Sequence, residues 1–225
     1  MLMLEDLARG TAPGEKRIFH PASNEADEHG AFFVIRPNYD YPVGKFSWEN
    51  QPDLSNYPRR VTVNLPKLPV GDFLPFILAF EGPASDVLDY YDQGSVSFIS
   101  DRLLDLLREF DPEGIEVSPA SMNCDGEVIG FNACTPMRTF TAADISTSQI
   151  EVRMRIVSET VLASFVYPNK YRLNPDIPSA IDIFADLAEP KMYWSRRLVK
   201  ACKESGIRGI SAQTTYATSV ETVQM

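Results

Sequence analysis

The latter half of the chain alternates short β-type runs with stretches of helical spacing. Residues 95–99 form an apolar run typical of a strand, and Ser100 then stands where a helix N-cap belongs. The leucines that follow recur at helical spacing up to Phe110, and Asp111-Pro112 ends the pattern. Residues 114–117 return to a β-type run. The pattern therefore predicts a strand–helix–strand unit in this part of the chain.

Other elements are predicted more locally. Period-two or continuous apolar runs predict strands at 31–35, 61–65, 127–131, 150–157 and 161–166. Residues 73–80 are also apolar but contain Pro75, so they predict either an edge strand or a kinked segment. Residues 85–91 favour a short helix with Ser85 as its N-cap. Residues 38–59 hold three prolines and several aromatic residues, which indicates either a long loop pinned by its rings or a set of short edge strands.

These elements divide the chain into four expected parts. Residues 1–30 are rich in glycine, proline and polar residues, so we expect them to be poorly structured. Residues 31–84 are expected to be β-rich and loop-rich. Residues 85–215 are expected to form an α+β domain, and residues 216–225 a tail.

One segment matches itself after a shift of 95 residues. The region 100–115 aligns without a gap with 195–210, and a serine followed by a leucine-rich stretch and a Gly-Ile pair occurs in both. Chance predicts about one identity over such a span. Six aligned positions are identical, namely Ser100, Arg102, Leu103, Glu109, Gly114 and Ile115 with Ser195, Arg197, Leu198, Glu204, Gly209 and Ile210.

The repeat predicts the fold class. We expect an α+β protein with a mixed sheet and short helices, in which a strand–helix–strand unit occurs at 96–118 and again at 191–213. Acidic-apolar pieces precede both units, at 86–89 and 182–185. Arg102 and Arg197 are expected to be first-turn surface charges whose stems lie on the sheet, with a functional pair as the alternative.

Composition narrows the classes of function. The net charge of −10 argues against nucleic acid and against anionic membrane surfaces, because both require a basic face. The N-terminus lacks the features of a secretory signal. The three cysteines, Cys124, Cys134 and Cys202, are too scattered for a disulfide framework or a zinc site, so we expect buried thiols in a reducing, cytoplasmic compartment.

The repeated motifs resemble those of a known family. A Phe-Ile-Ser or Tyr-Trp-Ser start, a leucine-rich helix and a Gly-Ile strand occur at 98–117 and 193–212, with a strand at 128–133 and Pro-x-x-Ile-Asp-Ile-Phe at 178–184 between them. This layout, over roughly residues 85–215, resembles a bacterial family of immunity proteins from polymorphic-toxin systems, first catalogued as a domain of unknown function.

The resemblance implies a cytoplasmic antidote that binds a cognate toxin. It implies no catalytic residue. The family's usual acidic residue after the middle strand has no clear counterpart at 136–140, and the nearest acid is Asp144.

The residues offer little for catalysis, a cofactor or a metal. The two histidines, His20 and His29, lie in the part expected to be poorly structured, which provides no rigid second shell for a metal. No nucleophile elbow or phosphate-binding glycine loop is present. The sequence therefore predicts neither an enzyme nor a cofactor or metal site.

Two acidic surfaces are the candidates for binding a basic partner. The first combines carboxylates with tyrosine anchors, and the second follows a helix end into a strand. The candidate residues are Asp86, Asp89, Tyr90, Tyr91 and Asp92 in the first surface, and Glu109, Asp111, Glu113 and Glu116 in the second.

The interpretation is an immunity protein that neutralises a toxin in a stoichiometric complex. The toxin is expected to present a basic surface. Two alternatives stay open: a non-catalytic adaptor or chaperone of a toxin secretion system, and an uncharacterised hydrolase.

Overall fold

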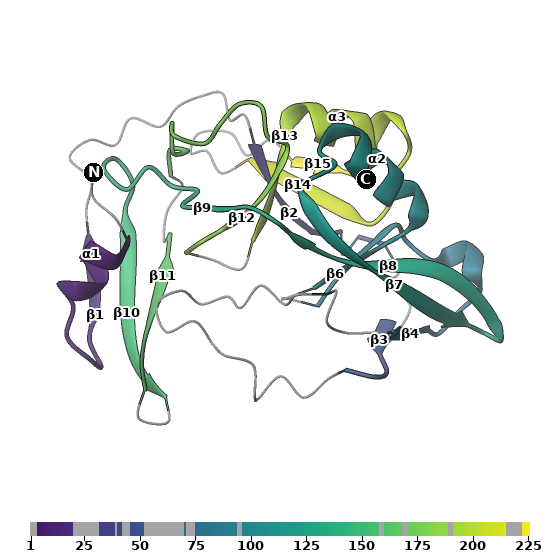
Figure 1. Ribbon diagram of the computed structural model, residues 1–225, viewed down its shortest axis with the longest axis horizontal. Helices are drawn as coiled ribbons and strands as arrows, with labels where there is room; N and C mark the ends of the chain where they lie inside the picture. The colour runs from purple at the N-terminus through teal and green to yellow at the C-terminus, as the bar shows by residue number, and fades with distance from the viewer. Residues whose placement is uncertain are drawn as a thin grey trace.

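A computed structural model describes most of the chain in three β-sheets and three short α-helices (Figure 1). The described residues are 4–19, 32–38, 40–41, 46–51, 70, 75–93, 96–157, 160–167, 171–188, 191–214 and 222–225. The strand expected at 61–65 and both histidines lie outside these residues. The α+β class with mixed sheets is confirmed. Within the described residues, no helix is long and apolar enough to cross a membrane.

Sheet A lies at one end of the molecule and has the order β1-β10-β11. Its strands are Lys16–Phe19, Ile150–Val157 and Thr160–Val166, all antiparallel. Helix α1, Leu4–Arg9, buries Leu4 and Leu7 in the core behind this sheet. The expectation of little structure in residues 1–30 is therefore wrong for residues 4–19, because two leucines three positions apart are enough to anchor a helix too short to recognise in the sequence.

Sheet B has the order β15-β14-β2-β13-β12-β9. Its strands are Thr222–Gln224, Ile210–Thr214, Phe32–Pro37, Met192–Ser195, Ile183–Asp186 and Thr139–Phe140. Residues 222–224, expected to belong to a tail, pair instead with β14.

Sheet C has the order β3-β4-β7-β8-β6-β5. Its strands are Phe46–Trp48, Phe76–Phe80, Ile115–Cys124, Glu127–Pro136, Ser97–Ile99 and Tyr90–Asp92. The predicted helix at 85–91 is wrong: a 3₁₀ turn at Ala84–Asp86 leads into β5. Tyr90 and Tyr91 are both buried, on opposite faces of a sheet covered on both sides, so the period-two alternation typical of a strand is absent.

The two repeat units have the same architecture. In copy one (Asp89–Pro136), hairpin β5-β6 leads into helix α2, Asp101–Phe110, and then into β7. In copy two (Asp182–Thr214), hairpin β12-β13 leads into helix α3, Arg196–Glu204, and then into β14. Ser100 and Ser195 cap the helices by accepting the N–H groups of Leu103 and Leu198, each at 3.2 Å, as predicted.

Each copy is completed by one further strand, which comes later in the chain in copy one and earlier in the chain in copy two. In copy one, β8 follows β7 and lies between β7 and β6. In copy two, β2 precedes the whole unit and lies between β14 and β13. The registers match: Val117 pairs with Cys134 as Ala212 pairs with Ile35, and both inserted strands end at a proline, Pro136 or Pro37. The N-terminal part of the chain is thus woven into the repeat.

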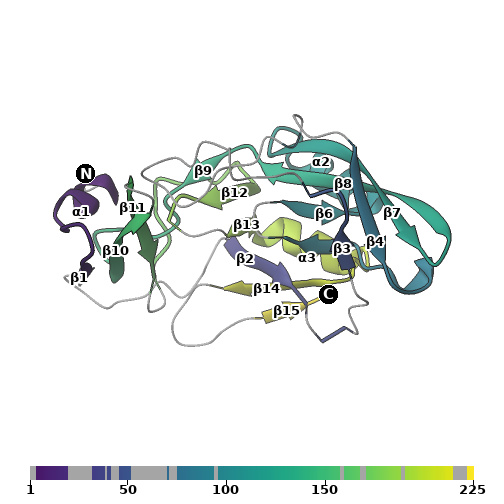
Figure 2. The ribbon, with the colours of Figure 1, turned by 90° about the horizontal axis from the view of Figure 1, so that it is seen from below.

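One core joins the copies. Helices α2 and α3 pack against each other, and their buried residues share a cluster with residues of sheets B and C. Tyr90 and Trp194 meet edge to face at 6.3 Å across this cluster. Sheets A and B enclose a second cluster, and a third lies on the far face of sheet C. Figure 2 shows sheet A at one end of the molecule and the hairpin of β7 and β8 at the other.

Candidate functional site

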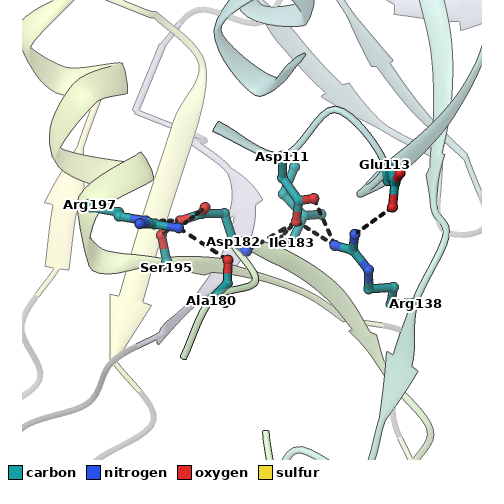
Figure 3. A network of polar contacts seen from close by, with 8 residues as sticks. All are labelled: Asp111, Glu113, Arg138, Ala180, Asp182, Ile183, Ser195 and Arg197. Carbon is teal, nitrogen blue, oxygen red and sulfur yellow. Dashed lines mark hydrogen bonds and ion pairs between the residues drawn. The ribbon is translucent and has the colours of Figure 1, made fainter. Parts of the chain in front are cut away.

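The most elaborate polar arrangement in copy two is built on Asp182, the residue before β12 (Figure 3). Its side chain is fully buried and accepts hydrogen bonds from the Ser195 hydroxyl and from both Nε and Nη2 of Arg197, with 2.7 Å to Nε. Arg197 also donates to the carbonyl of Ala180 at 3.2 Å. The hydrogen bond to Asp182, and then the charges of Asp182 and Asp111, raise the pKa of the Arg197 guanidinium further.

We call a buried aspartate that accepts hydrogen bonds from the capping serine and the first-turn arginine an aspartate clamp. Copy one has the same clamp. Asp89, 6% exposed, accepts the Ser100 hydroxyl at 2.7 Å and Arg102 Nη2 at 2.6 Å. Its second carboxylate oxygen also accepts the backbone N–H of Arg208 at 2.7 Å. The aspartates thus tie the start of each hairpin to the first turn of the following helix.

Asp111 links the two copies. It follows α2, and one of its oxygens accepts the backbone N–H groups of Asp182 and Ile183, both at 3.1 Å. Arg138 donates to both of its oxygens at 2.7 Å and lies 3.8 Å from the Glu113 carboxylate (Figure 3). The loop after α3 makes the reverse link, from copy two to copy one. The Arg208 N–H donates to Asp89, and the Gly206 carbonyl accepts from Arg102 at 3.0 Å.

Chemically, these groups form a scaffold. Each capping serine donates its hydroxyl proton to a carboxylate and accepts a backbone N–H, which is the geometry of a helix cap. Arg102 and Arg197 are exposed in the first turns of their helices, as expected, and each forms an ion pair with a buried aspartate, Asp89 or Asp182. Among the described residues, no group of three or more His, Cys, Asp or Glu could hold a metal ion.

A second buried polar cluster lies between sheets A and B. Tyr167 donates to Asp186 at 3.1 Å, and the Tyr171 and Tyr193 hydroxyls are hydrogen-bonded to each other. Burial, and then the neighbouring acidic groups, raise the pKa of Tyr167 and Tyr193 well above the ordinary tyrosine range. These phenols stay protonated and act as internal hydrogen-bonding groups.

The three cysteines are free and buried, as predicted. Burial raises the pKa of the Cys134 and Cys202 thiols to about 12. Cys202 takes the place that Leu107 has in copy one, and both side chains are fully buried. The thiols are core residues with suppressed thiolate character.

The first predicted acidic surface is not formed as expected. Only Asp86 is exposed, and Asp92 is half-buried. Tyr90 and Tyr91 are 2% and 4% exposed, and Asp89 is engaged in its clamp. The prediction of tyrosine anchors on a helix surface is wrong because the segment is a strand between two core clusters.

The second predicted surface is divided. Glu109 and Glu113 are exposed and Glu116 is half-buried, whereas Asp111 is buried beneath Arg138. Residues 136–140, where the family resemblance led us to look for an acid, supply this arginine instead. Asp144 accepts hydrogen bonds from the Ser146 and Thr147 hydroxyls in a local turn.

The aspartate clamps themselves were missed. The acidic pieces noted upstream of the two units begin at Asp86 and Asp182, whereas the hairpin registers make Asp89 the equivalent of Asp182. The sequence does contain a signal for the clamps, because an aspartate precedes a Ser-x-Arg motif in both copies. The loop between the aspartate and the serine differs in length between the copies.

A comparison with protein families decides the relationship. The Immunity protein family (Imm11) matches residues 19–217, which include β2 and both copies of the repeat. The chain belongs to this family. No curated protein matches it. In this Imm11 chain, the matched region contains both clamps and Asp111, so the family region corresponds to the interlocked pair of copies rather than to one of them.

Proposed function

We propose that this Imm11 protein neutralises a cognate bacterial toxin by binding it in a stoichiometric complex, as the antidote of a polymorphic-toxin system. The observation that carries the proposal is the family match over residues 19–217. The protein acts by occupying or distorting the toxin's active site, and it does so without catalysis, in the cytoplasm.

Two structural observations support a binding role. The buried aspartates and thiols are committed to the scaffold, so a partner meets the exposed faces of a stiff, interlocked core. The net charge of −10 favours a toxin with a basic surface, because complementary fields accelerate association.

Co-expression tests this function. The toxin domain encoded beside this gene is induced in a heterologous bacterium, with and without this chain, and growth is followed. We expect rescue together with a one-to-one complex on size-exclusion chromatography. A stable complex without rescue would support an adaptor, and the absence of both would overturn the proposal.

A further inference from the structure

The sheet of copy one extends beyond the part that matches copy two, and this extension forms a surface of its own. Strand β14 has 5 residues, whereas its equivalent β7 has 10, and β8 continues beside β7 to the hairpin turn. Strand β4 pairs in parallel with residues 120–124 of β7, and β3 pairs with β4. We call these four strand segments, namely β3, β4, 120–124 of β7 and 127–131 of β8, the platform. It lies at the end of the molecule opposite sheet A (Figures 1 and 2).

One face of the platform is packed with aromatic rings. Trp48 lies 5.3 Å from Phe76 and 5.4 Å from Phe98, and Phe46 stacks on Tyr91 at 4.3 Å. This dense base holds the platform in a fixed shape, and a preformed surface loses little entropy when a partner binds.

The opposite face is open. Strand alternation places this face on the side of sheet C on which α2 lies, beyond the end of that helix. Asn132 marks the side, because it donates to Asp101 of α2 at 2.7 Å. Val128 lies on this face with 66% of its surface exposed. Its neighbours are small or uncharged and exposed or half-buried: Ser47, Ile77, Ala79, Ser121, Asn123 and Gly130.

The hairpin turn that ends the platform is tight. Cys124 pairs with Glu127 across the two-residue turn Asp125-Gly126, in which both φ angles are positive, 41° and 92°. This combination is typical of a type I′ turn, the form that matches strand twist, so the tip is stiff too.

Charge distinguishes this face. The four strands β3, β4, β7 and β8 contain no lysine or arginine. Exposed carboxylates border this face at Glu49, Asp101 and Asp125. Sheet A, at the other end, instead carries Lys16 and Arg153 on one face, paired with Glu151. An apolar centre within an acidic border is complementary to a basic partner surface with an apolar contact at its middle.

We infer that the open face of the platform is where the toxin binds, through a basic surface whose apolar centre packs on Val128. The inference rests on the proposed function, because it assigns that complex to one face. Small side chains and Gly130 allow the toxin to approach the sheet closely, and the border carboxylates steer it in.

The test uses the three exposed large hydrophobic residues among those described: Ile18, Val128 and Met137, with 41%, 66% and 50% of their surface exposed. Val128→Arg places a cation at the centre of the platform, whereas Ile18→Arg in sheet A and Met137→Arg beyond β8 are matched controls. The dissociation constant for the catalytically inactivated toxin domain encoded beside this gene is measured by calorimetry. We expect a rise of about 30-fold or more for Val128→Arg and less than about 3-fold for each control.

A second pair of variants examines the acidic border. Glu49→Gln should lower the association rate constant and flatten its salt dependence, whereas Glu109→Gln on α2 should change neither. Thermal unfolding of every variant verifies that the fold is retained. If the wild-type chain binds and Val128→Arg binds equally well, the platform is not the site, although the proposed function stands. If the wild-type chain itself does not bind, the proposed function fails.

Discussion

Copy one and copy two of the repeat reach the same arrangement by different routes along the chain. Copy one is continuous from Asp89 to Pro136, so its central strand β8 follows directly from β7. Copy two takes its central strand, β2, from a segment that precedes it by well over a hundred residues. The registers are nevertheless the same. In both sheets, therefore, the pattern of side chains rather than the chain connection determines the register of the central strand.

The copies also differ in how deeply their charges lie. Asp182 is fully buried and its carboxylate bonds only side chains of its own copy among the bonds described above, whereas Asp89 is 6% exposed and also accepts the Arg208 N–H from copy two. Copy one therefore has a reserve donor when its arginine is removed.

Removing the inserted strand should have the largest effect. Deletion of residues 1–41 takes β2 from between β13 and β14, so we expect the cooperative thermal transition seen by near-ultraviolet circular dichroism to disappear. A synthetic peptide of residues 30–41 added to the truncated chain should restore part of the signal. The same peptide with Val34→Pro should not, because proline removes an amide donor from a central strand. A truncated chain that melts cooperatively alone would show that copy two does not need β2.

Loss of the clamp arginine should affect the copies unequally. Arg197→Ala leaves a fully buried carboxylate without its charge partner, and we expect the larger loss of the two arginine variants in the free energy of unfolding. Arg102→Ala should cost about 1.5 kcal/mol, since Asp89 keeps the donors Ser100 and Arg208. Urea unfolding followed by tryptophan fluorescence measures both. Lys200→Ala, which breaks only an exposed pair with Glu204, is the control and should cost less than about 0.5 kcal/mol. Equal losses in the two arginine variants would argue against a reserve donor.

The capping serines should show a smaller difference in the same direction. Ser195→Ala removes the cap of α3 and a donor to buried Asp182, for an expected loss of about 2 kcal/mol, and Ser100→Ala should cost about 1 kcal/mol. Threonine at either position retains the hydroxyl and should recover most of the loss in chemical denaturation. If threonine recovers nothing, packing rather than the hydroxyl determines the effect.

Thiol labelling should distinguish the copies without any substitution. Cys134 lies in β8 of copy one and Cys202 in α3 of copy two, and burial raises the pKa of both thiols to about 12. At pH 8 neither forms a thiolate in the folded state, so alkylation requires local opening. Peptide mass spectrometry of a labelling time course should find both protected for hours, with Cys202 reacting first because its copy depends on a distant strand. Rapid labelling of either thiol in the folded protein would contradict the structure.

The raised thiol pKa values have a definite consequence for stability at high pH. The folded pKa lies above the ordinary thiol value of about 8.5, so the unfolded chain releases its thiol protons first as the pH rises. The contribution of Cys134 and Cys202 is therefore full below about pH 8.5 and declines above it.

Local patterns predicted the helices of the repeat well and the sheets only in part. Ser100 and the leucines that follow it identify α2, because capping and helical spacing are properties of adjacent residues. The strands at 115–117, 127–131, 150–157 and 161–166 were likewise recognisable. Residues 85–91 were mistaken for a helix because a strand buried on both faces lacks alternation.

Long-range relations could not be predicted. No local property of residues 32–37 indicates that they lie between β13 and β14. The clamps were missed because the loops between aspartate and serine differ in length, so a constant shift misaligns Asp89. Arg138 and Asp111 meet only through the fold. The acidic surfaces were predicted from charge and residue type, which do not reveal that Asp89 and Asp111 turn inward to serve as hydrogen-bond acceptors.

The position of β2 also determines when the protein can become complete during its synthesis. This apolar strand leaves the ribosome roughly 160 residues ahead of Trp194, with which Phe33 pairs, and later still comes β14. Copy one can close as soon as β8 has emerged, whereas β2 must wait, exposed, until almost the whole chain has been translated. The nascent chain therefore exposes an unpaired apolar strand for most of its synthesis, and such a strand is a binding site for chaperones. The last step of folding then joins an early segment of the chain to its latest ones.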